Sequence, residues 1–172
     1  EVRRGFLKVI KRNGKSEEYN CKKIKKAVAF ACADLTVEPL QLESKFDETL
    51  FDGVTTQAIQ ANLIMHAKNL SSPVDDQWLL VAGRLATMSR WGNLGVYNKP
   101  FLDYYLEQRG NEEWSHTGFD VYSKEDIEII GTYIVKERDL QHTIASVETA
   151  ESKYLQENEC LQMMFIGNAI LY

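Results

Sequence analysis

The N-terminal fold is decided by Val9-Ile10-Lys11-Arg12-Asn13-Gly14 and, six residues later, by Asn20-Cys21-Lys22-Lys23-Ile24. Asn-Gly between two extended runs is the strongest short signal of a β-hairpin, so residues 6–12 and 16–19 are predicted to be its strands. Asn20 is a favourable N-cap residue, and a helix is expected to begin directly after it. The segment is therefore predicted to be a hairpin that leads straight into a helix.

Positive charge is concentrated in this segment. The first 26 residues hold 10 of the chain's 20 Lys and Arg but only three acids, a local charge of +7 on a chain whose net charge is −5. Cations beside the free backbone amides of a helix start can hold a polyphosphate, so the pattern predicts a nucleotide site near the N-terminus. The acidity of the whole chain argues against a general nucleic-acid binder.

Composition and cysteine usage limit the class of protein. With 172 residues, 44% of them apolar, the chain can form one large or two small packed domains. Its apolar runs fall short of the roughly 20 residues of a membrane span, and its charged N-terminus lacks the apolar core of a signal peptide. Three scattered cysteines without a CxxC pair disfavour a zinc ribbon and a disulfide framework. We expect a cytoplasmic protein without a membrane partner or a metal site.

Hydrophobic periodicity predicts a mainly helical chain after the hairpin. Apolar residues at helical spacing, with capping residues before them, predict helices over about 21–35, 39–50, 56–70 and 76–90. Gly and Asn between residues 92 and 100 are typical of a linker. Further helices are expected at about 101–108, 123–136 and 143–155. The start at Glu1 and the apolar run 163–172 favour a piece of a larger or split protein.

Several motifs occur together and in order along the chain. Lys11-Arg12-Asn13-Gly14, Glu17, Asn20, Lys23-Ile24 and Asp52-Gly53-Val54-Thr55-Thr56 resemble the ATP-cone, the regulatory nucleotide-binding module of ribonucleotide reductases. Val81-Ala82-Gly83-Arg84-Leu85 is similar to the Ala-Ala-Arg-Leu signature of the cone's last helix. Three later stretches resemble the large subunit of class I reductases: Lys136-Glu137-Arg138-Asp139, Lys153-Tyr154-Leu155 and Glu159-Cys160-Leu161-Gln162-Met163-Met164-Phe165.

The resemblance implies a fold and a division into domains. The fold is mainly α: an ATP-cone with a β-hairpin lid over a four-helix bundle in residues 1–91, then a helical N-terminal part of the reductase large-subunit body in residues 92–172. The family's catalytic barrel, with its thiyl-radical cysteine, redox cysteine pair and carboxylate, lies beyond this chain. None of Cys21, Cys32 and Cys160 matches those positions, so this segment alone is expected to be non-catalytic.

The resemblance also implies which residues hold a nucleotide. Lys11 and Arg12 would hold the triphosphate, and Glu17 and Asn20 would read the adenine or the ribose. A carboxylate such as Glu17 can accept a hydrogen bond from an exocyclic amine. The full set implied for the allosteric activity site is Val9, Lys11, Arg12, Glu17, Asn20, Lys23, Ile24, Thr56, Gln60 and Arg90, with ATP or dATP as effectors and Mg²⁺ on the triphosphate.

The chain departs from the family pattern at two places in this site. Family members often carry His or Asp where Gln60 stands. They often carry Lys near the end of the fourth helix, where this chain has Arg90-Trp91-Gly92-Asn93, and Arg90 is the candidate substitute. These departures keep open a degenerate ATP-cone that serves as a helical docking module without nucleotide binding. They leave the assignment of the family unchanged.

The leading hypothesis is the N-terminal regulatory portion of a class I ribonucleoside-diphosphate reductase large subunit, which senses ATP against dATP. The implied partners are the remainder of the large subunit, the small radical subunit and further copies in a homo-oligomer. A transcriptional regulator with an ATP-cone would need a zinc ribbon with paired CxxC, which the sequence lacks. The apolar run at residues 160–172 is expected to contact the rest of the large subunit.

Overall fold

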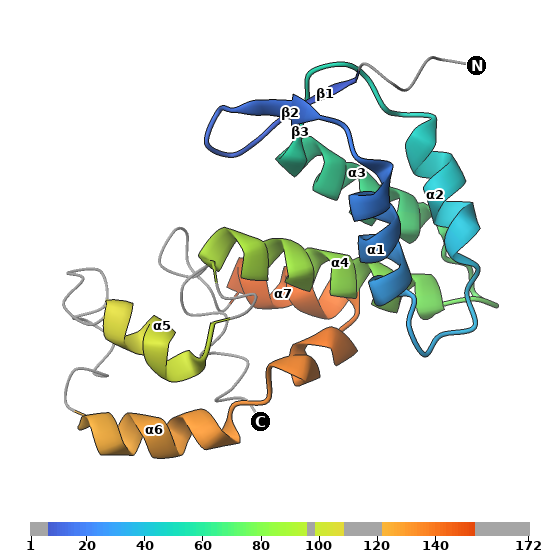
Figure 1. Ribbon diagram of the computed structural model, residues 1–172. Coiled ribbons are helices and arrows are strands. Elements are labelled where there is room, and N and C mark those ends of the chain that lie inside the picture. The colour runs from blue at the N-terminus through green and yellow to red at the C-terminus, as the bar shows by residue number, and fades with distance from the viewer. Residues whose placement is uncertain (1–6, 96–98, 109–121, 154–172) are drawn as a thin grey trace. The chain divides into compact units, whose positions relative to one another are not determined.

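The computed structural model describes residues 7–95, 99–108 and 122–153. Its elements, drawn in Figure 1, are β1 (Lys8–Ile10), β2 (Ser16–Glu18), α1 (Cys21–Ala31), α2 (Pro39–Asp47), β3 (Val54–Thr55), α3 (Thr56–Leu70), α4 (Gln77–Leu94), α5 (Phe101–Gln108), α6 (Lys124–Tyr133), a 3-10 helix (Lys136–Gln141) and α7 (Ile144–Lys153). The mainly α fold with a β-hairpin is thereby confirmed. The predicted contact segment 160–172 and the motif at residues 159–165 lie outside the described residues.

Contacts divide the chain into two units. The described residues up to Ala86, together with Gln141–Val147, form the first unit, and Thr87–Leu140 with the residues from Glu148 onward form the second. The division at residues 91 and 92 that the sequence suggested stays a prediction.

The sheet of the first unit has three strands in the order β2-β1-β3. The predicted hairpin is confirmed, with Val9 opposite Glu17 in the antiparallel β1–β2 pair. Strand β3 was not predicted, because two residues are too short to show alternation. It pairs in parallel with β1, Val9 opposite Val54, and it runs directly into α3. The central strand of the sheet, β1, is therefore bonded to β3, about forty-five residues further along the chain, and β3 leads into α3.

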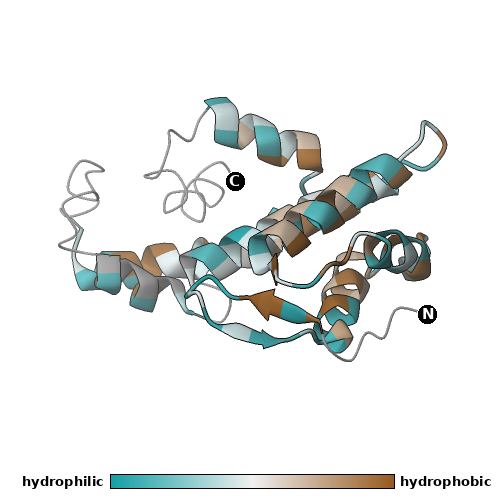
Figure 2. Cartoon of the chain, turned by 90° about the horizontal axis from the view of Figure 1, so that it is seen from above, coloured by the Kyte–Doolittle hydropathy of each residue, from teal (hydrophilic) through white to brown (hydrophobic). Residues whose placement is uncertain are grey.

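The helices of the first unit bury one face each. Trp78, Val81 and Ala82 on α4 are almost fully buried, as the periodicity predicted, and so are Leu63 and Ala67 on α3. Figure 2 shows apolar and polar residues sharing each helix, which is the pattern of a helix with one face toward a core. The remaining buried apolar residues of this unit include Val28, Ala31, Leu42, Phe46, Val54 and Ile59.

Two residues of α4 make close contacts with neighbouring segments. The Arg84 guanidinium donates to the Ala31 carbonyl oxygen at 3.1 Å and to the Ala33 carbonyl oxygen at 2.5 Å. These contacts satisfy carbonyls that the end of α1 leaves without helical partners. Gly83 lies against the backbone of Thr143 and Ile144: a Cβ there would come within 2.8 Å of Thr143 C and 2.9 Å of Ile144 N. Only glycine fits at this contact.

Several helix ends differ from the predictions. Helix α1 ends at Ala31 instead of residue 35, because the chain turns through Asp34 at a positive φ of 63°. Helix α2 ends at Asp47 instead of residue 50, where the Thr49 hydroxyl donates to the Phe46 carbonyl oxygen. The predicted linker at residues 92–100 was wrong in its first part, since α4 continues to Leu94.

The second unit contains the end of α4, α5, α6, the 3-10 helix and the later part of α7. Ser123 caps α6 as predicted, within a capping box closed by Asp126. Helix α6 ends at Tyr133, three residues earlier than predicted, because Ile134 is extended and the 3-10 helix follows. Ile127 is fully buried and forms part of the unit's core.

Candidate functional site

The inner face of the hairpin presents an apolar residue and two charged ones. Val9 and Glu17 face each other across the β1–β2 pair, and the Lys11 N–H continues the ladder by donating to the Lys15 carbonyl oxygen at 2.8 Å. Residues directly opposite each other in a strand pair share a face, so Val9 and Glu17 lie on the same side, and the contact of Lys11 with Glu17 brings the Lys11 side chain to that side too. Val9 is 4% exposed, which anchors this face on the bundle. The tight turn beyond uses Gly14 at a φ of 76°.

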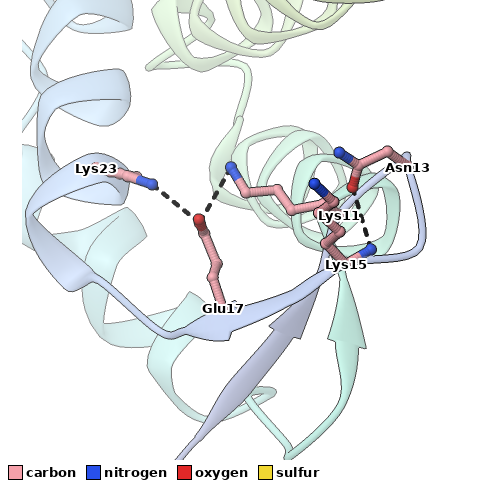
Figure 3. A network of polar contacts seen from close by, with 5 residues as sticks. All are labelled: Lys11, Asn13, Lys15, Glu17 and Lys23. Carbon is pink, nitrogen blue, oxygen red and sulfur yellow. Dashed lines mark hydrogen bonds and ion pairs between the residues drawn. The ribbon is translucent and has the colours of Figure 1, made fainter.

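Glu17 is the centre of an ion network between the hairpin and α1. Its Oε1 atom lies 3.1 Å from Lys11 Nζ and 2.9 Å from Lys23 Nζ, so one carboxylate oxygen holds both ammonium groups. In Figure 3 the Glu17 side chain extends from the hairpin toward the space between the two lysines. The hydrogen bonds from Lys23 and then from Lys11 lower the pKa of the Glu17 carboxyl below its usual value. Two cations are therefore fixed close together around one acceptor.

A second group of polar side chains lies on the other side of the turn. Arg12 donates from Nη2 to Gln60 Oε1 on α3 at 3.2 Å. Together with Lys11, Asn13 and Thr56, these two residues line a hollow of about 350 Å³. Strand β1 ends at Ile10, so Lys11 and Arg12 belong to the turn, and their side chains diverge toward α1 and α3 respectively. The hollow thus has one Lys and one Arg at its rim.

Two helix starts adjoin these residues. Asn20 caps α1, and its side-chain oxygen accepts from the Lys22 N–H at 3.0 Å. Thr55 caps α3, and its hydroxyl accepts from the Ala58 N–H at 3.0 Å. The cap of α1 is the one that the sequence predicted. Helix N-termini carry partial positive charge, which adds to the lysines and the arginine in favouring an anion here.

The sheet fixes the hairpin on the start of α3. The Lys8 N–H donates to Asp52 Oδ1 at 2.8 Å, and the Gly53 N–H donates to the Lys8 carbonyl oxygen at 2.9 Å. Strand β3 then leads into Thr56. This connection places Arg12 opposite Gln60, a pairing that residue spacing alone does not reveal.

Two of the predicted site residues have other surroundings. Ile24 lines a different hollow, of about 270 Å³, between α1 and α2. Arg90 lies in the second unit, where its guanidinium pairs with Glu151 of α7. Burial lowers the pKa of Arg90 to about 10, still far above neutrality, so the group remains charged and needs the Glu151 carboxylate. The structure therefore pairs Arg90 with Glu151 in the second unit. The predicted site residues that it brings together are Lys11, Arg12, Glu17, Lys23, Thr56 and Gln60.

The described residues contain neither a cluster of metal ligands nor a helix that could span a membrane. Over residues 7–95, 99–108 and 122–153, no three His, Cys, Asp or Glu side chains gather in a way that could hold a metal ion. None of the helices in that part of the chain has the length and apolar character needed to cross a bilayer.

Comparison with known proteins assigns this region to a family. The model of the ATP cone domain matches residues 7–91, which include the hairpin, both caps and the hollow. Over 169 residues the chain is 31% identical to ribonucleoside-diphosphate reductase subunit alpha of Synechocystis sp. and 27% identical to ribonucleoside-diphosphate reductase 1 subunit alpha of Escherichia coli K12. Each alignment covers 96% of this chain and 22% of the relative. The chain thus spans about a fifth of the length of the curated relatives it matches.

Proposed function

Since residues 7–91 belong to the ATP-cone family, we propose that the chain is the N-terminal regulatory portion of a ribonucleoside-diphosphate reductase large subunit. Its role is to bind ATP or dATP at the hairpin and so to control the reduction of ribonucleotides to deoxyribonucleotides by the whole enzyme. The segment itself carries no catalytic group. Its partners are the remainder of the large subunit, the small radical subunit and further copies of the large subunit, in the cytoplasm.

One observation carries this proposal: three cations of the turn and of α1 converge beside two helix starts. Lys11 and Lys23 meet at Glu17, and Arg12 stands over the hollow with Gln60. Lys11 and Arg12 hold the triphosphate with Mg²⁺, while Lys23 and Thr56 complete the polar wall. Val9 and Ile24 supply apolar surface for the base, and Glu17 and Asn20 recognise the adenine or the ribose. Arg90 is the remaining candidate for a phosphate contact.

Regulation requires ATP and dATP to stabilise different states of the protein. The two ligands differ only in the 2′-hydroxyl group. Gln60 stands where the family often has His or Asp, and its side chain is already bonded to Arg12. A ribose that engages Gln60 therefore also changes the freedom of the phosphate-binding arginine.

Calorimetric titration of the full chain with ATP and dATP tests the proposal. Charge-assisted contacts are worth about 1.5–3 kcal/mol, so Lys11→Ala should weaken ATP binding roughly 10- to 150-fold, at 1.4 kcal/mol per decade. Lys8→Ala is the matched control, because it removes the same charge from an exposed position on the opposite face of β1. Equal binding by wild type and Lys11→Ala would show that the site has been assigned to the wrong residues.

The second candidate function is a degenerate ATP-cone that acts as a docking module. The pairing of Arg90 with Glu151 favours it, because that cation already has a partner in the second unit. The same titration separates the two functions. Absence of ATP and dATP binding at millimolar concentration would replace the nucleotide sensor with the docking module.

A further inference from the structure

We propose that Glu17 is a built-in competitor for the triphosphate: its carboxylate and the phosphates use the same two ammonium groups, Lys11 and Lys23. When a nucleotide takes these cations, the carboxylate is released and becomes available to the exocyclic amine of adenine. The inference rests on the proposed function and adds a mechanism by which the site requires both halves of the nucleotide.

The geometry supports competition between the two anions. A single oxygen, Glu17 Oε1, lies 3.1 Å from Lys11 Nζ and 2.9 Å from Lys23 Nζ (Figure 3). Lys11 is also part of the lining of the 350 Å³ hollow that Arg12 borders. Lys11 therefore belongs both to the carboxylate network and to the phosphate side of the site, and it cannot satisfy both anions with the same hydrogen bonds.

The exchange is feasible because all three side chains are accessible. The side chains of Lys11 and Glu17 are each 38% exposed, and that of Lys23 is 60% exposed. Ion pairs at such exposure are weak, so a polyphosphate with several negative charges can displace one carboxylate. The lysine side chains then rotate away from Glu17 while the backbone of the hairpin keeps its ladder.

The consequence is a coupling between the two ends of the ligand. A triphosphate without a base must release Glu17 and leaves the carboxylate without a new partner. A base without phosphates meets a carboxylate whose Oε1 atom is already bonded to two lysines. An adenine nucleotide avoids both disadvantages. Its phosphates bind the two lysines, and the exocyclic amine of its base then donates to the released Glu17 carboxylate. The site thus favours the complete nucleotide over its fragments.

The test uses inorganic tripolyphosphate and ATP as separate probes, by calorimetry on the full chain at low salt. Glu17→Gln keeps the shape of the side chain and removes the competing charge. Loss of two exposed ion pairs predicts that it binds tripolyphosphate about 2- to 30-fold more tightly than the Glu18→Gln control does. Its affinity for ATP should improve less, so the preference for ATP over tripolyphosphate should shrink. Glu17→Ala should behave in the same way.

The control is Glu18→Gln. Glu18 is the next residue of β2, lies exposed on the opposite face and stands opposite Lys8, so this variant changes the net charge equally close to the site. Equal tripolyphosphate affinities for the Glu17→Gln and Glu18→Gln variants would overturn the inference. If tripolyphosphate binding improves as expected while wild type binds no ATP, the competition for the lysines stands and the nucleotide assignment fails.

Discussion

Gly83→Ala should destabilise the first unit, because the added methyl group has no room. The methyl carbon would overlap the carbonyl oxygen of His142 and come within 2.8–2.9 Å of the backbone of Thr143 and Ile144. Contacts between carbon atoms are favourable at about 3.5–4.0 Å, so the segment has to move by about 1 Å or more. All three neighbours are backbone atoms, and no side-chain rotation relieves the overlap.

The size of the effect follows from what that movement disturbs. Overpacking of this kind costs about 1–3 kcal/mol. Ile144 and Val147, in the first turns of α7, are 4% and 2% exposed. Moving this part of the helix therefore also exposes buried apolar area. The higher helix propensity of Ala returns up to about 1 kcal/mol. We expect a net loss of about 1–3 kcal/mol, which lowers the Tm by roughly 2–12 °C for a chain of this size.

Gly92→Ala provides the matched control for this prediction. Gly92 is an exposed residue of the same helix, so its substitution is expected to gain helix propensity. It should raise the free energy of unfolding by up to about 1 kcal/mol. Urea unfolding followed by circular dichroism measures both variants, and hydrogen exchange at the first turn of α7 localises the damage. Equal stabilisation by both substitutions would refute the close contact at Gly83.

Three further predictions concern charged side chains. Arg84→Gln should lose the guanidinium contacts that end α1 and lower the free energy of unfolding by about 1.5–3 kcal/mol, as measured by urea unfolding. Glu151→Gln should leave the buried Arg90 guanidinium without its counter-charge and cost about 1–3 kcal/mol, whereas the double variant Arg90→Met with Glu151→Gln should recover part of that loss. The lowered pKa of Glu17 means that its ion pairs stabilise the fold above the usual carboxyl pKa and are lost as the pH falls through the lowered value. The difference in stability between wild type and the Glu17→Gln variant should therefore vanish in acid, and a difference that grows as the pH falls below 4 would contradict it.

Local chemistry made the N-terminal part of the fold predictable. Asn13-Gly14 specified the turn, and Asn20 and Thr55 specified the two caps, because each of these features acts within three residues of its own position. The site residues around Lys11 could be proposed for the same reason, since they follow the hairpin and the helix start directly. The ion network of Glu17 with both lysines needed the folded hairpin, because it depends on how far the strand extends toward α1.

Tertiary contacts account for what the sequence did not reveal. The helix α4 continues through Gly92, where the burial of Trp91 at 5% exposure offsets the poor propensity of the glycine. The pairing of Arg90 with Glu151 could not be predicted, because the two residues lie sixty-one positions apart, beyond the reach of any local pattern. The short strand β3 has no periodicity of its own and exists because β1 offers a free edge.

The position of β1 between two strands has a consequence for how a ligand reaches the hairpin. A flap that swings open must give up the backbone bonds along one of its edges, and here both edges of β1 are bonded, to β2 and to β3. If a nucleotide binds at the hairpin as proposed, we expect its exchange to need only side-chain rotations, which take picoseconds to nanoseconds, instead of a strand opening in microseconds or longer. If the Gly53 amide keeps its protection from hydrogen exchange while nucleotide binds and dissociates, the strands stay paired. Loss of that protection would argue for a flap that opens. The three short strands thus hold the backbone of the hairpin in place, and in the proposed mechanism only lysine and glutamate side chains move to admit the ligand.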